Sequence, residues 1–138
     1  MISLFRTNRL PYRDPEEIRG LINGSEPYHL VDVRSREEFE DGFIPTAVWI
    51  PYEQIVETPP TQDPDALIIL YCYSGVRSET ARKALIHAGY SRVYNFGGII
   101  HWPGELVTEG GTKDSAKVNG AETAGSNANA DDAGNAGV

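Results

Sequence analysis

The 138-residue chain contains only one cysteine, Cys72, and one methionine. A single cysteine cannot form an internal disulfide, which excludes a disulfide-stabilised fold. It also excludes disulfide oxidoreductases and arsenate reductases that need a second, resolving thiol in the same chain. This use of cysteine favours a reducing, cytoplasmic setting.

Basic charge is also scarce, because 12 lysines and arginines face 20 aspartates and glutamates, for a formal net charge of -8. Such a surface repels phosphates, so we expect no nucleic-acid partner. Long apolar runs are missing as well. The opening MISLF stops at Arg6, too early for a signal peptide, and no later stretch approaches the ~20 apolar residues of a membrane span. We therefore expect no membrane partner.

Aromatic residues are absent from residues 108–138, where Val118 and Val138 are the only apolar side chains beyond alanine. This composition cannot bury enough surface to offset roughly 1–2 kcal/mol of backbone ordering per residue. We predict a flexible, disordered C-terminal tail over residues 108–138. Residues 1–107 are then one folded domain, large enough for a hydrophobic core.

Helix and strand patterns alternate along that domain. Strands are predicted at 30–33, 47–50, 67–71 and 92–95, and helical segments begin at Pro15, at Arg36 and after the turn that contains Cys72. The strand 67–71 is almost continuously apolar, which is typical of a strand buried on both faces. The alternation predicts an α/β fold with a mainly parallel sheet flanked by helices.

Cys72 follows the strand 67–71 and opens the turn CYSGVRS, residues 72–78. In open α/β sheets, ligands bind beyond the carboxyl ends of the strands, where loops lead into helix N-termini. Such a turn can direct several backbone N–H groups towards one point. Gly75 allows a backbone conformation closed to most residues, and Arg77 adds a charged fork suited to an oxyanion. We predict that these donors lower the pKa of the Cys72 thiol.

A lone cysteine after a strand is usually a small buried hydrophobe. Here its neighbours favour chemistry, because they place an anion cradle beside a nucleophile. We interpret Cys72 as the candidate catalytic residue. The candidate substrate-binding residues are those that follow it: Tyr73, Ser74, Gly75, Val76, Arg77 and Ser78.

The segment CYSGVRS resembles the active-site loop of the rhodanese-like sulfurtransferases, which begins with cysteine, has glycine fourth and often ends in Arg-Ser. Three other segments agree in order and spacing. VDVRSREEFEDGFIPTA resembles the family's D-x-R … E-[FY] … G-H-I-x-G-A region, Ala47–Pro51 its strand with a proline step, and NFGGIIHW its G-G-x-x-x-W motif. The four segments span roughly residues 11–107. Two positions depart from the pattern: Phe43 replaces the usual histidine and Thr46 the usual glycine, which affects local packing more than catalysis.

The resemblance implies a parallel five-stranded sheet flanked by helices and a two-step sulfur transfer. The Cys72 thiolate would take the outer sulfur of an anionic donor such as thiosulfate, and the persulfide would pass it to cyanide, a thiol or a protein. The N–H groups of residues 73–77 would hold the persulfide, Arg77 would bind the donor, and Tyr73 and Ser74 would line the mouth. We expect a monomer that works with a small-molecule donor and acceptor.

Two other functions are considered. Phosphatases also use a cysteine–arginine loop, but their interval is one residue longer than Tyr73–Val76, and the shorter ring suits a sulfur atom better than a phosphoryl group. The second alternative is a non-enzymatic or weakly active rhodanese-like module that carries sulfur or binds a protein. The presence of Cys72, Gly75 and Arg77 argues against it.

Other polar residues are given structural roles. Asp32 and Arg34, at the end of a predicted strand, are expected to form a structural ion pair. Glu79 and Arg82 are spaced as an i, i+3 pair on a helix surface. The histidines His29, His87 and His101 are widely separated in the sequence, so we expect neither a metal ion nor a cofactor.

Overall fold

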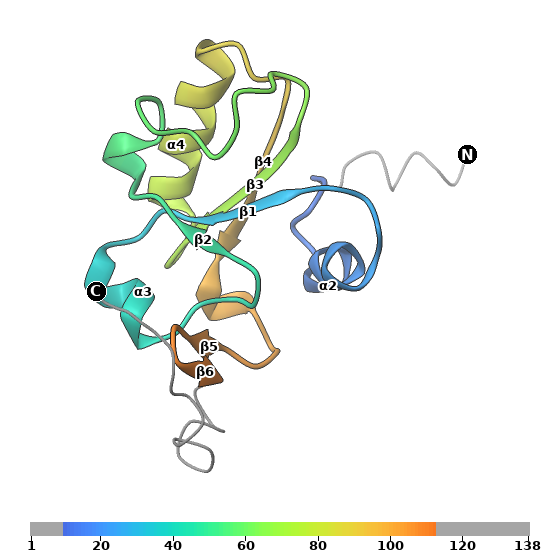
Figure 1. Cartoon of the computed structure of the whole chain (residues 1–138), viewed down its shortest axis with the longest axis vertical. Coiled ribbons are helices and arrows are strands. Elements are labelled where there is room, and N and C mark those ends of the chain that lie inside the picture. The colour runs from blue at the N-terminus through green and yellow to red at the C-terminus, as the bar shows by residue number, and fades with distance from the viewer. Residues whose placement is uncertain (1–9, 113–138) are drawn as a thin grey trace.

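The computed structural model describes residues 10–112. They form a parallel sheet in the order β2-β1-β3-β4, with helices packed against it (Figure 1). The strands are β1 (His29–Asp32), β2 (Val48–Trp49), β3 (Leu67–Cys72) and β4 (Arg92–Gly98). The predicted α/β class, with a parallel sheet flanked by helices, is confirmed. The described residues supply four of the five strands that the resemblance implied.

Two of the three α-helices in the described part of the chain begin at side-chain caps, and the third begins after Gly75 without one. The helices are α2 (Pro15–Asn23), α3 (Arg36–Asp41) and α4 (Val76–His87), with short 3₁₀ turns η1 (Tyr52–Gln54) and η2 (Ile99–His101). The Asp14 carboxylate accepts the backbone N–H of Glu16 at the start of α2, which satisfies a free helix-end donor. Ser35 and Glu38 form a reciprocal capping box at the start of α3.

Strand β3 divides the hydrophobic core into two halves, because successive side chains of a strand point to opposite faces. All six of its residues are buried, as the continuous apolar run predicted. Leu67, Ile69 and Tyr71 face the side covered by α2 and α3. Ile68, Leu70 and Cys72 face α4, where they join Ala81 and Leu85. Cys72 is therefore directed towards the helix that follows it.

The folded chain continues to Thr112, past the domain boundary predicted at residue 107. Strands β5 (Val107–Thr108) and β6 (Gly111–Thr112) form an antiparallel pair. Phe43 and Val107 exchange two backbone hydrogen bonds of 2.9 Å, which tie this pair to the end of α3. The rest of the predicted tail, residues 113–138, lies outside the described residues.

The two departures from the family pattern have different local consequences. Phe43 is buried and stacks on Phe39, with ring centroids 4.1 Å apart, so an aromatic pair occupies the place of the usual histidine. Thr46 has a φ of 78°, in the left-handed region that β-branched residues avoid and glycine tolerates. The Tyr28 hydroxyl donates to Thr46 Oγ1 at 3.0 Å. Thr46 therefore has a strained backbone conformation, and its side chain accepts a hydrogen bond.

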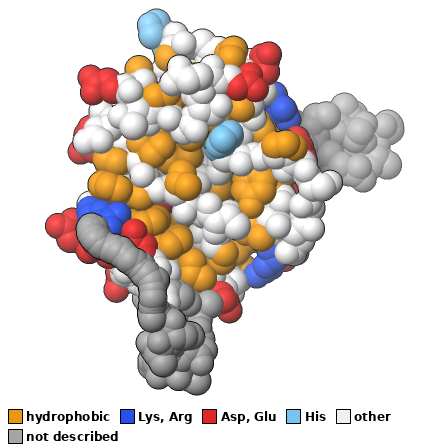
Figure 2. Space-filling view, viewed as in Figure 1, with side chains coloured by type: hydrophobic (Ala, Val, Ile, Leu, Met, Phe, Trp, Pro, Cys, Tyr) orange, Lys and Arg blue, Asp and Glu red, His pale blue; other side chains and the backbone are white. Residues whose placement is uncertain are grey.

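The surface carries no continuous apolar band on the face seen in Figure 2. Apolar side chains lie in several clusters there, and the acidic side chains lie mostly towards the rim. No helix between residues 10 and 112 is both long and apolar enough to cross a bilayer.

Candidate active site

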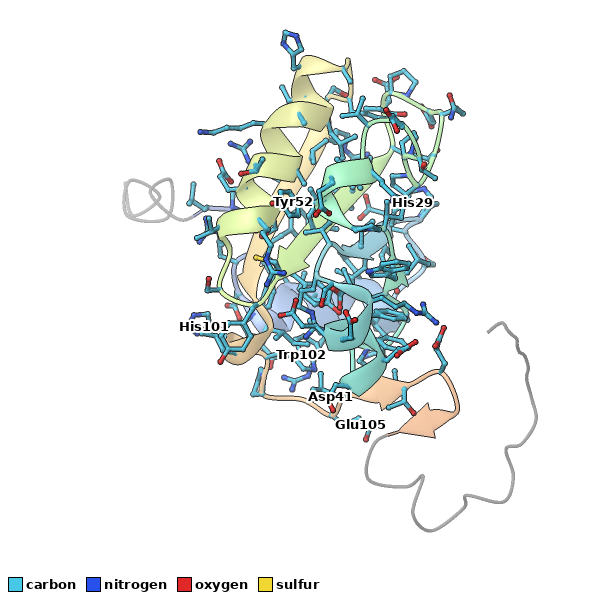
Figure 3. All side chains as sticks on the ribbon, turned by 90° about the vertical axis from the view of Figure 1, so that its left-hand side faces the viewer. His29, Asp41, Tyr52, His101, Trp102 and Glu105 are labelled. Carbon is cyan, nitrogen blue, oxygen red and sulfur yellow. The ribbon has the colours of Figure 1, made fainter. Side chains whose placement is uncertain are left out.

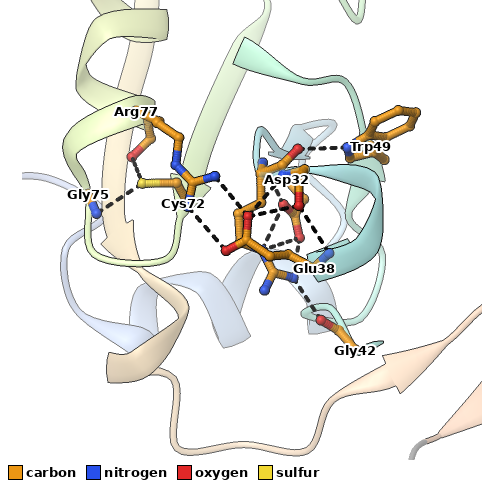
Figure 4. A network of polar contacts seen from close by, with 10 residues as sticks. Asp32, Glu38, Gly42, Trp49, Cys72, Gly75 and Arg77 are labelled. Atoms are coloured by element: carbon orange, nitrogen blue, oxygen red, sulfur yellow. Dashed lines mark hydrogen bonds and ion pairs between the residues drawn. The ribbon is translucent and has the colours of Figure 1, made fainter. Parts of the chain in front are cut away.

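The Cys72 sulfur lies at the carboxyl end of β3, inside the turn that leads into α4 (Figure 4). Its Sγ accepts the backbone N–H of Gly75 at 3.0 Å and lies 3.4 Å from the Ser78 hydroxyl oxygen. Gly75 has a φ of 111°, and a Cβ on it would meet the Gly97 Cα at 3.2 Å. The turn therefore needs glycine for both its backbone angle and its close approach to β4, which confirms the predicted conformational role of Gly75.

Donors surround the Cys72 thiol although the residue is only 1% exposed. Burial by itself raises the pKa of this thiol. The Ser78 hydroxyl and the backbone N–H groups of Ser78, Gly75 and Ser74 outweigh burial, so the pKa is lower than that of an ordinary cysteine. Of the backbone donors predicted at residues 73–77, those of Ser74 and Gly75 act on the sulfur, and Ser78 adds another, so Cys72 is more than a packed apolar residue.

Arg77 lies at the site with its charge already paired. Its Nη1 and Nη2 donate to the two carboxylate oxygens of Glu38 at 2.8 and 3.2 Å, and both side chains are about one-third exposed. The guanidinium lowers the pKa of Glu38 to about 2. Glu38 in turn raises the pKa of Arg77, and Cys72 adds to this effect. Arg77 was predicted at the site from the sequence, whereas Glu38 was not predicted as its partner.

Glu38 joins the Cys72 turn to helix α3. The same carboxylate accepts the backbone N–H of Ser35 at 3.0 Å and the Ser35 hydroxyl at 3.1 Å, closing the capping box. Glu38 stands in the E-[FY] segment of the sequence, so its motif position was visible while its contact with Arg77 was not. A helix start and the candidate donor-binding arginine therefore share one carboxylate.

Asp32 and Arg34 form the predicted ion pair beside this region (Figure 4). Arg34 Nη2 lies 2.7 Å from Asp32 Oδ2 and also donates to the Gly42 carbonyl at 2.7 Å. The Trp49 indole N–H donates to the Arg34 carbonyl at 2.8 Å. Asp32 is fully buried and Arg34 is 6% exposed. The pair therefore braces the loops beside the site without facing the Cys72 sulfur.

Exposed apolar side chains stand around the mouth of the turn. Tyr73 is 53% exposed, Val76 is 72% exposed, and Ile100 is 52% exposed. The backbone N–H of Ile100 lies 3.5 Å from the Tyr73 carbonyl, which brings η2 beside the turn. Tyr73 and Val76 are thus at the surface of the turn, and Ile100 of η2 joins them.

Asn95 of β4 is hydrogen-bonded to the turn and to the start of α4, and it was not predicted as a site residue. Its Oδ1 accepts the Ser78 hydroxyl at 2.7 Å. Its Nδ2 donates to the Gly75 carbonyl at 3.1 Å and to Glu79 Oε1 at 3.2 Å. Asn95 is only 6% exposed. An amide side chain between the apolar residues Tyr94 and Phe96, at the end of a predicted strand, is the sequence signal that could have identified it.

The histidines do not gather into a metal site. His29 and His101 lie on opposite sides of the molecule in Figure 3. Among residues 10–112, no three histidine, cysteine, aspartate or glutamate side chains are grouped as metal ligands would be.

Comparisons with known proteins agree with this geometry. Residues 14–104 match the sequence profile of the rhodanese-like domain. YtwF of Bacillus subtilis is 39% identical over 61% of this chain and 82% of its own length. A sulfurtransferase of Allochromatium vinosum is 37% identical over 64% of this chain and 84% of its own. The structure of an E. coli rhodanese with anions is 28% identical, with a TM-score of 0.52 over 59% of this chain and 99% of that one. The chain therefore belongs to the rhodanese-like family.

Proposed function

We propose that this protein is a sulfurtransferase that moves a sulfane sulfur through a Cys72 persulfide. The donor is an anion such as thiosulfate, and the acceptor is cyanide, a thiol or a protein. The observation that carries the proposal is a thiol with a lowered pKa, whose Sγ accepts the Gly75 N–H at 3.0 Å at the start of a helix. The names of the relatives and the anions bound by the E. coli rhodanese support it.

The first step forms one sulfur–sulfur bond and breaks another. The Cys72 thiolate attacks the outer sulfur of thiosulfate, and sulfite leaves with the electron pair of the old bond. In the second step the acceptor attacks the outer sulfur of the persulfide. The pair of the Sγ–S bond then returns to Cys72 as a thiolate. The N–H groups of the turn stabilise the charged sulfur in both states, as an oxyanion hole does for oxygen.

Persulfide formation tests the proposal directly. Incubation with excess thiosulfate is expected to add one sulfur atom to the intact mass, and cyanide is expected to remove it. The Cys72→Ser variant is expected to gain nothing, and because Cys72 is the only cysteine the added sulfur has a single possible site. A folded wild-type protein that gains no sulfur from thiosulfate or any other sulfane donor would instead be an interaction module.

Glu38 is expected to compete with the donor for Arg77. Glu38→Gln keeps a capping-box residue at the start of α3 but removes the charge that occupies the guanidinium. The thiosulfate KM is therefore expected to fall about fivefold, the equivalent of ~1 kcal/mol for a partly exposed ion pair. Steady-state kinetics at constant ionic strength measure this change in KM.

Arg77→Ala is the matched variant for this prediction. Loss of a charge-assisted hydrogen bond is expected to raise the thiosulfate KM about 10- to 100-fold, while persulfide formation at saturating donor is partly retained. An unchanged KM in Arg77→Ala would show that the guanidinium does not meet the donor. An unchanged KM in Glu38→Gln alone would show that donor and carboxylate bind Arg77 together.

A further inference from the structure

The Ser78 hydroxyl has one hydrogen and three acceptors within reach. Its oxygen lies 2.7 Å from Asn95 Oδ1, 3.4 Å from Cys72 Sγ and 3.4 Å from the Gly97 carbonyl. A serine hydroxyl can donate to only one of them at a time. Ser78 is fully buried, so its hydrogen bonds are made within the protein. The three acceptors therefore compete for one hydrogen, and a charged acceptor competes better than a neutral one.

The Asn95 amide is held in one orientation. Its Nδ2 faces the Gly75 carbonyl and a Glu79 carboxylate oxygen, at 3.1 and 3.2 Å, and both of these groups only accept hydrogen bonds. A flipped amide would place Oδ1 against two acceptors. Oδ1 must therefore face Ser78. This contact is the shortest of the three that the Ser78 hydroxyl makes.

We propose that Asn95 is a positioning residue for sulfur transfer, acting through Ser78. Asn95 Oδ1 accepts the Ser78 hydrogen while the Cys72 sulfur is uncharged, as a thiol or as the inner sulfur of a persulfide. When the thiolate forms, its charge makes it the stronger acceptor, and the hydroxyl turns to Sγ. Asn95 thus gives the hydrogen a second acceptor in each cycle and stabilises the persulfide relative to the free thiolate.

Charged groups also face this sulfur from the neighbouring elements. Arg77 of α4 favours the thiolate, and Glu38 of α3 opposes it through Arg77. Glu79 of α4 contacts the far side of the Asn95 amide, and Arg13 lies near Gly97. These groups are the same in all the variants below. A comparison between the wild-type and Ser78→Ala backgrounds therefore removes their contribution.

The test is a double-mutant cycle on the pKa of Cys72, followed by the ultraviolet absorbance of the only thiolate in the chain. Asn95→Leu frees the Ser78 hydrogen for the thiolate but also releases the Gly75 carbonyl, and this second effect is shared with the Ser78→Ala background. The shift that Asn95→Leu causes in the pKa of Cys72 is expected to be about 0.5–1 unit more negative in the wild-type background than in the Ser78→Ala background. Equal changes in the two backgrounds would overturn the proposal.

Asn95→Asp provides a second test that keeps the size of the side chain. The second oxygen of the aspartate would face the Gly75 carbonyl and Glu79 Oε1, and this repulsion is shared by both Ser78 backgrounds. The first oxygen is a charged acceptor that holds the Ser78 hydrogen more strongly, so the pKa of Cys72 is expected to rise further with Ser78 present than in the Ser78→Ala background. An equal rise in both backgrounds would show a through-space charge effect and overturn the proposal. Ser91→Ala is the control, since that hydroxyl contacts the Pro64 carbonyl and Asp65 and is expected to leave the pKa unchanged.

The role of Asn95 in the reaction cycle rests on the proposed function, but this test does not. If Asn95 and Ser78 are coupled but no sulfane donor forms a persulfide, the proposed sulfurtransferase function is overturned. The effect of Asn95 on the Cys72 thiol then still holds. If the persulfide forms but the two residues are not coupled, only the proposed positioning role of Asn95 is overturned.

Discussion

Replacing Gly98 by alanine is expected to slow persulfide formation about 100-fold, the order of loss that follows a displacement of reacting groups by roughly 1 Å. Gly98 lies beside Cys72 in the register of β3 and β4. A Cβ on Gly98 would stand 2.2 Å from the Tyr73 carbonyl oxygen and 2.7 Å from the Ser74 Cα. Both are backbone atoms of the candidate loop, so the loop must move. The N–H groups that it directs at Sγ move with it.

Gly89→Ala is the matched control for this substitution. Gly89 has a φ of 112°, so alanine there is strained by about 1–2 kcal/mol, but its Cβ would meet nothing within 4 Å. It is expected to lower the free energy of unfolding while leaving the rate of persulfide formation unchanged. Single-turnover mass measurements and thermal unfolding separate the two effects. A Gly98→Ala protein with a rate within twofold of wild type would show that the loop tolerates the clash.

The elements of this fold could be predicted where burial or capping leaves a local signal. The run from Leu67 to Tyr71 is apolar at every position because β3 is covered on both faces, and the structure extends it only to Cys72. Asp14 and Pro15 marked the start of α2 because capping depends on adjacent residues. The candidate loop was recognisable for the same reason, since all its parts lie within one short segment.

Contacts between distant segments could not be predicted in this way. The pairing of Arg77 with Glu38 depends on α3 and α4 starting beyond the carboxyl ends of the neighbouring strands β1 and β3. The contact of Asn95 with Ser78 depends on the register of β4 against β3. The pair of strands β5 and β6 has little apolar content and is held by backbone hydrogen bonds between Val107 and Phe43. Local sequence patterns do not indicate which distant segments will pair.

Asp32→Ala is expected to lower the free energy of unfolding by about 3–5 kcal/mol, because it leaves a buried guanidinium without its counter-charge. Asp32 accepts the Arg34 Nε at 3.0 and 3.1 Å and Nη2 at 2.7 Å. It also accepts the backbone N–H of Arg34 at 3.0 Å. The remaining partner of the guanidinium would be the Gly42 carbonyl, which carries no full charge. Urea unfolding at neutral pH measures the loss.

Two comparisons identify the cause of that loss. Glu40→Ala removes the carboxylate of an exposed pair with Arg36 and is expected to change the free energy of unfolding by less than ~0.5 kcal/mol. Adding Arg34→Met to Asp32→Ala removes the unpaired charge, so the double variant is expected to regain part of the stability. A double variant that is less stable than Asp32→Ala alone would mean that the hydrogen bond from Arg34 to Gly42, and not the ion pair, is the main contribution. The loop after α3 would then depend on Arg34 as an anchor, and Asp32 would serve only to orient it.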